Sequence, residues 1–211
     1  MEQLSLPRRG RRDSAWLVLF EFALILALFV ADFRHHIFFS KVPWLFLLVW
    51  VSLRWRELGW RDVGLAGPAN WPRAITIGVL CGIGMELLEL FVTQSVLVKV
   101  FHKIPDFSEL GDLQDNWELA LLFIALALIL GAFGEEMVYR GYLMNRVAGL
   151  FRKPEFAWAL SLVFVSFLFG LAHIDQGITG QVENMIAGLL LGMIFLATVC
   201  NLWAAAVKPT A

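Results

Sequence analysis

Residues 119–133 read Leu-Ala-Leu-Leu-Phe-Ile-Ala-Leu-Ala-Leu-Ile-Leu-Gly-Ala-Phe, and no side chain in this run is charged. Gly134 follows, and residues 135–140 then read Glu-Glu-Met-Val-Tyr-Arg. An ionised side chain at membrane depth costs at least ~2.5 kcal/mol on insertion scales, so such groups usually mark a functional site. The stretch therefore predicts a transmembrane helix with a polar site at or near its end.

The composition of the whole chain agrees with a membrane protein. Of its 211 residues, 59% are apolar and 17% are charged. A soluble domain has nearer ~45–50% apolar and ~25% charged residues. Cys81 and Cys200 lie within apolar runs, so we interpret them as small buried hydrophobes and not as a disulfide or a metal site.

Several apolar segments divide the chain into about six helical spans, which predicts an all-α polytopic bundle. A helix needs ~20 residues to cross ~30 Å of hydrocarbon, and lipid offers no partners for open backbone groups. We expect residues 1–14 to form a basic cytoplasmic tail and residues 15–211 a single transmembrane domain. Glycine pairs spaced by four at 78/82 and 188/192 fit close helix packing, which we expect to be internal to the bundle, with dimerisation as the alternative. The predicted spans are residues 15–31, 37–53, 75–98, 117–133, 156–171 and 185–200.

Basic residues in the connecting segments predict the orientation. By the positive-inside rule these residues place the N-terminus and the two basic loops, between spans two and three and before span five, on the cytoplasmic side of the plasma (inner) membrane. We interpret the N-terminal arginines as topology signals, neither a twin-arginine export signal nor a nucleic-acid patch. The tryptophans at 44, 50, 55, 60, 71, 117 and 158 are mostly near span ends, as interface anchors are. The basic residues are Arg8, Arg9, Arg11, Arg12, Arg54, Arg56, Arg61, Arg73, Arg146, Arg152 and Lys153.

The acidic pair has chemistry suited to hydrolysis. On a helix, Glu136 and Arg140 are four residues apart and share a face, so the arginine is expected to hold Glu136 ionised and oriented. Glu135 points ~100° away and stays available to accept a proton from water. A carboxylate in such surroundings is a candidate general base.

A second motif ends at His173, in the sequence Phe169-Gly-Leu-Ala-His173. If the flanking helices form a hairpin at Lys153, Glu136 and His173 lie 17 and 20 residues from the turn. At ~1.5 Å rise per residue these are depths of ~26 and ~30 Å, so the two groups meet at a similar level. Phe169 shares the His173 face. The set predicts a carboxylate and an imidazole around one water.

Other interpretations of these residues remain open. Glu135, Glu136 and Arg140 fit a structural ion cluster with a snorkelling arginine, and His173 fits a span-end histidine bonded to a neighbour. A zinc site lacks the His-Glu-x-x-His pattern, so we expect neither a metal nor another cofactor. Further intramembrane acids are Glu21, Glu86 and Glu89, which fit structural pairs or, for the last two, a proton or substrate path.

The motifs Glu-Glu-x-x-x-Arg-Gly at 135–141 and Phe-x-x-x-His at 169–173 resemble those of the CPBP family, also called the Abi or CAAX protease family. Residues 176–177, 187–192 and 201–204 are also similar to bacterial members, so the resemblance covers roughly residues 117–204. It implies an intramembrane endopeptidase acting on membrane-associated peptides, some members being linked to bacteriocin self-immunity. It further implies that Glu135 and His173 activate water while Glu136 and Arg140 order the site.

The chain departs from the family at its C-terminus. Members usually carry a final helix with His-x-x-x-Asn or His-x-x-x-Asp, which steadies the oxyanion, but no histidine follows His173. A truncated reading frame, an impaired enzyme, or substitution by Asn184 each fits this departure. The alternative function is a membrane scaffold or immunity factor without catalysis. A proton-coupled transporter built on Glu86 and Glu89 finds no support from an inverted repeat.

Overall fold

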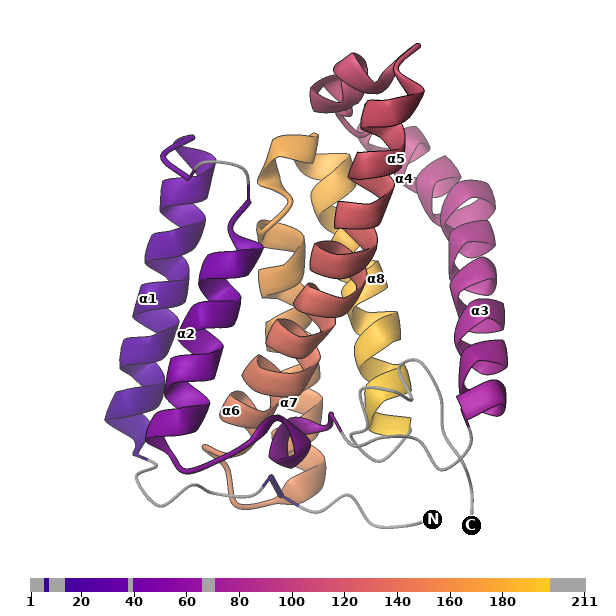
Figure 1. The fold of residues 1–211 in the computed structure, drawn as a ribbon. Coiled ribbons are helices and arrows are strands. Elements are labelled where there is room, and N and C mark those ends of the chain that lie inside the picture. The colour runs from indigo at the N-terminus through magenta and orange to yellow at the C-terminus, as the bar shows by residue number, and fades with distance from the viewer. Residues whose placement is uncertain (1–5, 8–13, 38–39, 66–70, 198–211) are drawn as a thin grey trace.

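The computed structural model describes residues 6–7, 14–37, 40–65 and 71–197, and all regular elements within these ranges are helices (Figure 1). The predicted all-α fold is confirmed. Most of the basic tail, Cys200 and residues 201–204 lie outside the described residues. The elements are α1 (Ala15–Phe33), α2 (Val42–Trp55), η1 (Trp60–Val63), α3 (Trp71–Leu88), η2 (Glu89–Thr93), α4 (Gln94–Phe101), η3 (Ser108–Leu113), α5 (Trp117–Leu126), η4 (Ala127–Glu135), η5 (Met137–Met144), α6 (Asn145–Ala148), α7 (Pro154–Leu171), η6 (Ile174–Gln176) and α8 (Gly177–Ala197).

Five helical stretches in the described chain are long and apolar enough to cross a membrane, and α2 is a shorter apolar helix. Together they match the six predicted spans. The last helix begins at Gly177 and not at residue 185, because polar residues of its first turns are buried against protein, as Glu183 is. The five stretches are Ala15–Phe33, Gly78–Phe101, Trp117–Ala148, Pro154–Leu171 and Ile174–Ala197.

The fourth span is longer than predicted, because it runs from Trp117 to Ala148 through the acidic motif. The side chain of Asn116 caps its start by accepting a hydrogen bond from the Leu119 N–H at 3.1 Å. No proline interrupts the helix before Pro154. Its central segments η4 and η5 are π-helical, a winding that often marks functional sites. The acidic pair therefore lies inside a helix and not at its end.

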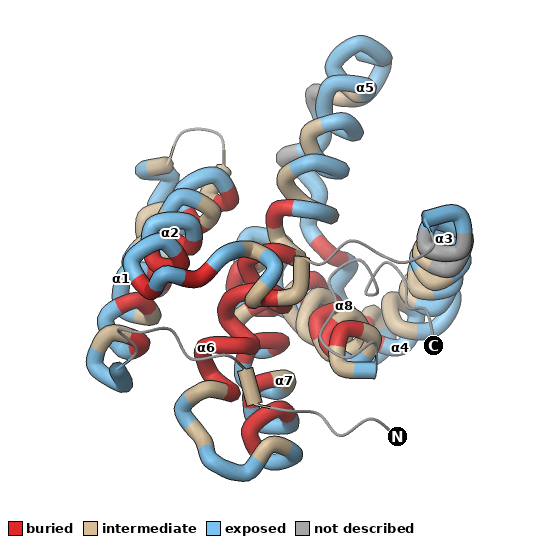
Figure 2. The backbone as a smooth tube through the Cα atoms, turned by 60° about the horizontal axis from the view of Figure 1, so that its bottom comes forward, coloured by how far each residue is buried: buried red, intermediate tan, exposed pale blue. Residues whose placement is uncertain are grey.

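The core of the protein surrounds η5. All eight residues from Met137 to Met144 are buried, and Arg140 is only 1% exposed. Figure 2 shows buried backbone on this segment and on the neighbouring sides of α2, α7 and α8, whereas α3 and α5 are mostly exposed. The helix that carries the acidic motif is thus the central element of the bundle.

Helices α7 and α8 pack closely at glycines. A Cβ atom at Gly170 would lie 2.5 Å from the Gln181 carbonyl oxygen, and one at Gly188 would lie 3.2 Å from the Ser166 Cα. The predicted role of the 188/192 pair in helix packing is thereby confirmed. The corresponding expectation of internal packing is wrong at Gly82, where a Cβ would meet no atom within 4 Å. The reason is that this face of α3 is not covered by another described helix.

A buried polar network joins α1 and α2 to η5. Arg56 donates from both terminal nitrogens to Glu21, with 2.8 Å between Nη2 and Oε2. Ser52 donates to Glu21 at 2.6 Å and lies 2.5 Å from the Tyr142 hydroxyl. Since a serine has one O–H, Tyr142 donates to Ser52. The structural interpretation of Glu21 is confirmed.

Two of the cations counted as loop charges are in fact buried. Arg56 is 0% exposed, and Arg146 is 4% exposed with its guanidinium 5.5 Å from the centre of the Tyr142 ring. Because both guanidinium groups lie inside the bundle, they are weaker evidence for the orientation of the protein in the membrane than the exposed Arg54 and Arg152 are. The cytoplasmic N-terminus stays a prediction.

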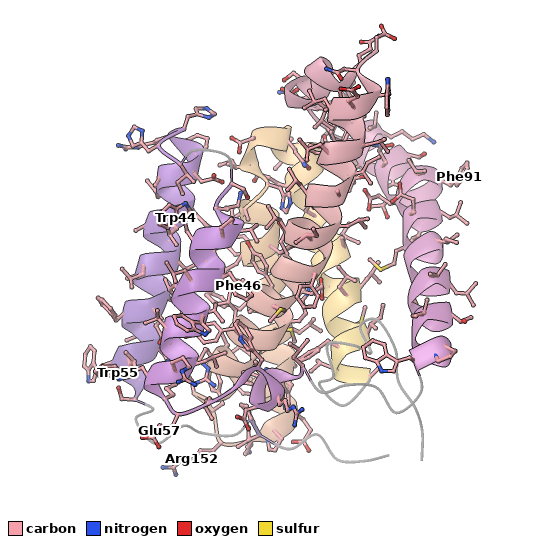
Figure 3. The ribbon with its side chains drawn as sticks, in the orientation of Figure 1. Trp44, Phe46, Trp55, Glu57, Phe91 and Arg152 are labelled. Carbon is pink, nitrogen blue, oxygen red and sulfur yellow. The ribbon has the colours of Figure 1, made fainter. Side chains whose placement is uncertain are left out.

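The exposed aromatic residues agree only partly with the expected interface anchors. Trp44 and Trp55 lie near opposite ends of α2, and Phe91 projects from η2 away from the bundle (Figure 3). Their exposed fractions are 53%, 57% and 73%. Trp158 is only 2% exposed, so the prediction is wrong for this residue. It lies on the face of α7 that packs into the core.

Candidate active site

The two motifs meet across an antiparallel helix pair formed by η5–α6 and α7. Ser161 of α7 donates a hydrogen bond to the Met144 carbonyl oxygen at 2.7 Å. Further along, the Arg140 guanidinium lies 4.6 Å from the centre of the Phe169 ring. Glu136 precedes Arg140 by four residues and His173 follows Phe169 by four, so the pairing carries both toward the same end. The expected hairpin is confirmed.

Glu136 and Arg140 form the contact expected from their spacing. The distance from Oε1 of the carboxylate to Nη1 of the guanidinium is 2.9 Å. Arg140 also donates from Nη2 to the Gly188 carbonyl oxygen of α8 at 3.4 Å. Its charge is thus held between the acidic helix, the Phe169 ring and α8. A buried guanidinium with these partners fixes the orientation of Glu136.

His173 lies in the turn after α7, outside the candidate spans, and its ring is fixed by Phe169. Its Nδ1 is 2.8 Å from the Phe169 carbonyl oxygen, and the two ring centres are 4.9 Å apart. Because a carbonyl only accepts hydrogen bonds, Nδ1 carries the proton and Nε2 keeps its lone pair. Burial lowers the pKa of His173, and the positive charges of Lys41 and Arg140 act in the same direction. The ring is therefore neutral at neutral pH.

Glu135 is the last residue of η4 and is half-buried. The strongest charge acting on it comes from Lys41, followed by those of Arg140 and Glu136. The start of α2 thus contributes a positive charge that acts on Glu135. Its predicted pairing with His173 around one water stays a prediction.

Two residues of this region escaped the sequence interpretation. Tyr139 is 1% exposed, and its ring meets the Phe169 ring edge-on with 4.9 Å between centres. Its position four residues after Glu135 was a usable signal. Lys41 is far from both motifs in the sequence, and only the fold brings its charge to Glu135 and His173.

Glu89, another predicted intramembrane acid, lies at a small cavity between η2 and α8. Glu89 lines a small cavity together with Glu183, which is 4% exposed and whose Oε1 has no hydrogen-bond partner among the described residues. Glu86 is exposed. Within the described residues, no group of three or more His, Cys, Asp or Glu side chains is placed to hold a metal ion. The expectation of a reaction without metal stays a prediction.

Asn184, the residue considered as a substitute for the final family helix, is held by its own helix and by the preceding η6. Its Nδ2 donates to the Gln176 side chain at 2.8 Å and to the Gly180 carbonyl oxygen at 2.9 Å. Both N–H groups of one amide are therefore engaged. This arrangement argues against a role for Asn184 as an oxyanion donor.

Comparison with known proteins supports the resemblance. Residues 116–207 match the family model described as type II CAAX prenyl endopeptidase Rce1-like. The match agrees with the region of 117–204 expected from the motifs. Neither a curated protein nor a solved structure matches the chain significantly.

Proposed function

Since residues 116–207 match the family model of the Rce1-like type II CAAX prenyl endopeptidases, we propose that this membrane protein is an endopeptidase that cleaves membrane-associated peptides. One observation carries the proposal. The guanidinium of Arg140, paired with Glu136, and the imidazole of His173 both contact the Phe169 ring within an apolar bundle.

The chemistry follows from the roles of four side chains. Glu135 takes a proton from water as the water oxygen attacks the scissile carbonyl carbon, and Nε2 of His173 accepts a hydrogen bond that orients this water. The carbonyl electron pair moves to the oxygen and returns when the C–N bond breaks. The proton then passes to the leaving amine. Glu136 and Arg140 keep the acidic helix in register with α7.

The same proposal includes a location and a biological setting. We infer an inner-membrane protein with a cytoplasmic N-terminus, supported by the exposed arginines of the connecting segments. Bacteriocin self-immunity is a setting in which such a peptidase would act. Lipid and a peptide that reaches the site from the membrane are its expected partners.

A direct assay tests the function. The purified protein is reconstituted in lipid vesicles and incubated with membrane-associated peptides, with and without a prenylated cysteine, and products are identified by mass spectrometry. We expect cleavage within the peptide and not at its terminus. If every peptide stays intact while one binds tightly, the protein is a binding scaffold and the proposal is wrong.

The pH dependence of cleavage reports on His173. Because burial lowers the pKa of this histidine, the ring stays neutral until the pH falls below the ordinary value of 6.5. Protonation then removes the Nε2 lone pair. We expect kcat/KM to decrease through an acid limb that lies below 6.5, since kcat/KM reports groups of the free enzyme. Since protonation of Glu135 also removes activity, the limb of His173 is identified in the residual activity of Glu135→Gln, and its absence there below 6.5 would contradict the role of a neutral imidazole.

A further inference from the structure

Lys41 stands at the start of α2, outside the region matched by the family. Its Nζ is 2.5 Å from the Asp32 carboxylate at the end of α1, and the two side chains are only 16% and 20% exposed. An ammonium has three N–H donors, and this contact uses one of them. The side chain is therefore a fixed and largely enclosed cation that can donate to a second acceptor.

The start of α2 packs directly against the acidic helix. A Cβ atom on Gly134 would lie 2.9 Å from Cγ1 of Val42. The residue after Lys41 thus touches the residue before Glu135. Figure 1 shows the end of α1 and the start of α2 at the same end of the bundle as the last turn of α7, which precedes His173.

The charge of Lys41 reaches both residues assigned to water activation. It acts on Glu135 more strongly than Arg140 does, although Arg140 belongs to the same long helix. It also acts on His173, again ahead of Arg140. The close approach of Val42 to Gly134, together with this influence on both groups, points to an ammonium within reach of the proposed site.

Hydrolysis of an amide needs a donor for the oxygen that becomes negative. Arg140 balances the charge of Glu136 and contacts the Gly188 carbonyl oxygen and the Phe169 ring, so its charge is committed to the acidic helix even though its Nη1 makes no hydrogen bond among the described residues. Asn184 donates both of its amide N–H groups to Gln176 of η6 and to Gly180 of its own helix. We propose that Lys41 is the oxyanion-binding catalytic residue of this site, donating an N–H of its ammonium to the oxygen of the tetrahedral intermediate. The inference rests on the proposed peptidase function.

Lys41 neither gains nor loses a proton during the hydrolysis. The new bond joins the water oxygen to the carbonyl carbon, and the carbonyl π electrons become the oxyanion that Lys41 binds. When the C–N bond breaks, these electrons re-form the carbonyl and the proton held by Glu135 goes to the amine. Lys41 thus stabilises only the charge that develops during reaction, so its loss acts on kcat and not on KM.

The test compares Lys41→Met with the wild-type protein in the vesicle assay. Loss of one oxyanion donor commonly reduces kcat by ~10²–10³-fold, and we expect this decrease with an unchanged KM. Lys99→Met, which removes an exposed cation on α4, is the matched control and is expected to keep wild-type kinetics. Lys41→Gln provides a milder variant, and thermal unfolding shows which variants are folded.

A thioamide substrate separates catalysis from structure. Sulfur accepts hydrogen bonds poorly, so replacing the scissile carbonyl oxygen with sulfur slows the wild type more than Lys41→Met if Lys41 binds that oxygen. A wild-type kcat in either folded Lys41 variant, a change in KM alone, or an equal sulfur effect in variant and wild type would overturn the proposal. Absence of cleavage by the wild-type protein instead rejects the peptidase function itself.

Discussion

Glu135→Gln and His173→Gln are each expected to reduce kcat for peptide cleavage by about 10²–10⁴-fold. Glutamine at 135 keeps the size of the side chain but cannot take a proton from water. Glutamine at 173 removes the Nε2 lone pair that orients this water. Because both positions are half-buried and neither belongs to the ion pair, the variants should remain folded. The measurement is single-turnover cleavage in lipid vesicles, together with thermal unfolding.

Matched controls exist for both positions. Glu118→Gln changes an exposed glutamate on the same long helix, and His102→Gln changes an exposed histidine after α4. Both are expected to cleave at the wild-type rate. Cleavage at that rate by folded Glu135→Gln or His173→Gln would reject the catalytic assignment of the residue concerned.

Arg56→Met is expected to lower the free energy of unfolding by about 3–5 kcal/mol, because it leaves the Glu21 carboxylate buried without its cation. The loss of stability should be large because Glu21 is 5% exposed, and because Ser52, which donates a hydrogen bond to Glu21, is itself bonded to the Tyr142 hydroxyl. Titration with a denaturing detergent, followed by circular dichroism, measures the change.

Two further variants isolate the effect of the pair. Arg54→Met removes an exposed arginine from the same helix and is expected to change the unfolding free energy little. The double variant Glu21→Gln/Arg56→Met removes both charges and should recover part of the stability, since no buried charge is left uncompensated. If the double variant is no more stable than Arg56→Met alone, the pair does not act as a unit.

Hydrophobicity and length were sufficient to predict the membrane class, the helical fold and six spans. The boundaries failed where charged residues lie inside the bundle. The hydropathy pattern predicts that the span ends at residue 133, before the charges of 135–140, whereas a buried environment with partners lets the helix continue to Ala148. In the same way, the charge of Glu183 led the hydropathy pattern to predict a start at residue 185, although α8 begins at Gly177. Hydropathy treats each charge as solvated, so it cannot recognise one that is paired or enclosed by protein.

The candidate site was predicted to the extent that it depends on local spacing. Glu136 and Arg140 are four residues apart and pair, and Phe169 and His173 have the same separation and pack together. Lys41 carried no comparable signal. Its charge reaches Glu135 only because α2 folds back onto η4 at Gly134, a contact between distant parts of the sequence.

The hydrogen bond between Ser52 and Tyr142 limits how freely the family-matched region can be exchanged between proteins. It connects the N-terminal helices, which lie outside residues 116–207, to the centre of the family-matched region. A chimera that exchanges residues 116–207 with those of another member would bring a different partner to the buried Glu21–Arg56 pair. Natural variation at position 142 should therefore be correlated with variation at 21, 52 and 56, so that the matched segment is inherited together with its N-terminal helices.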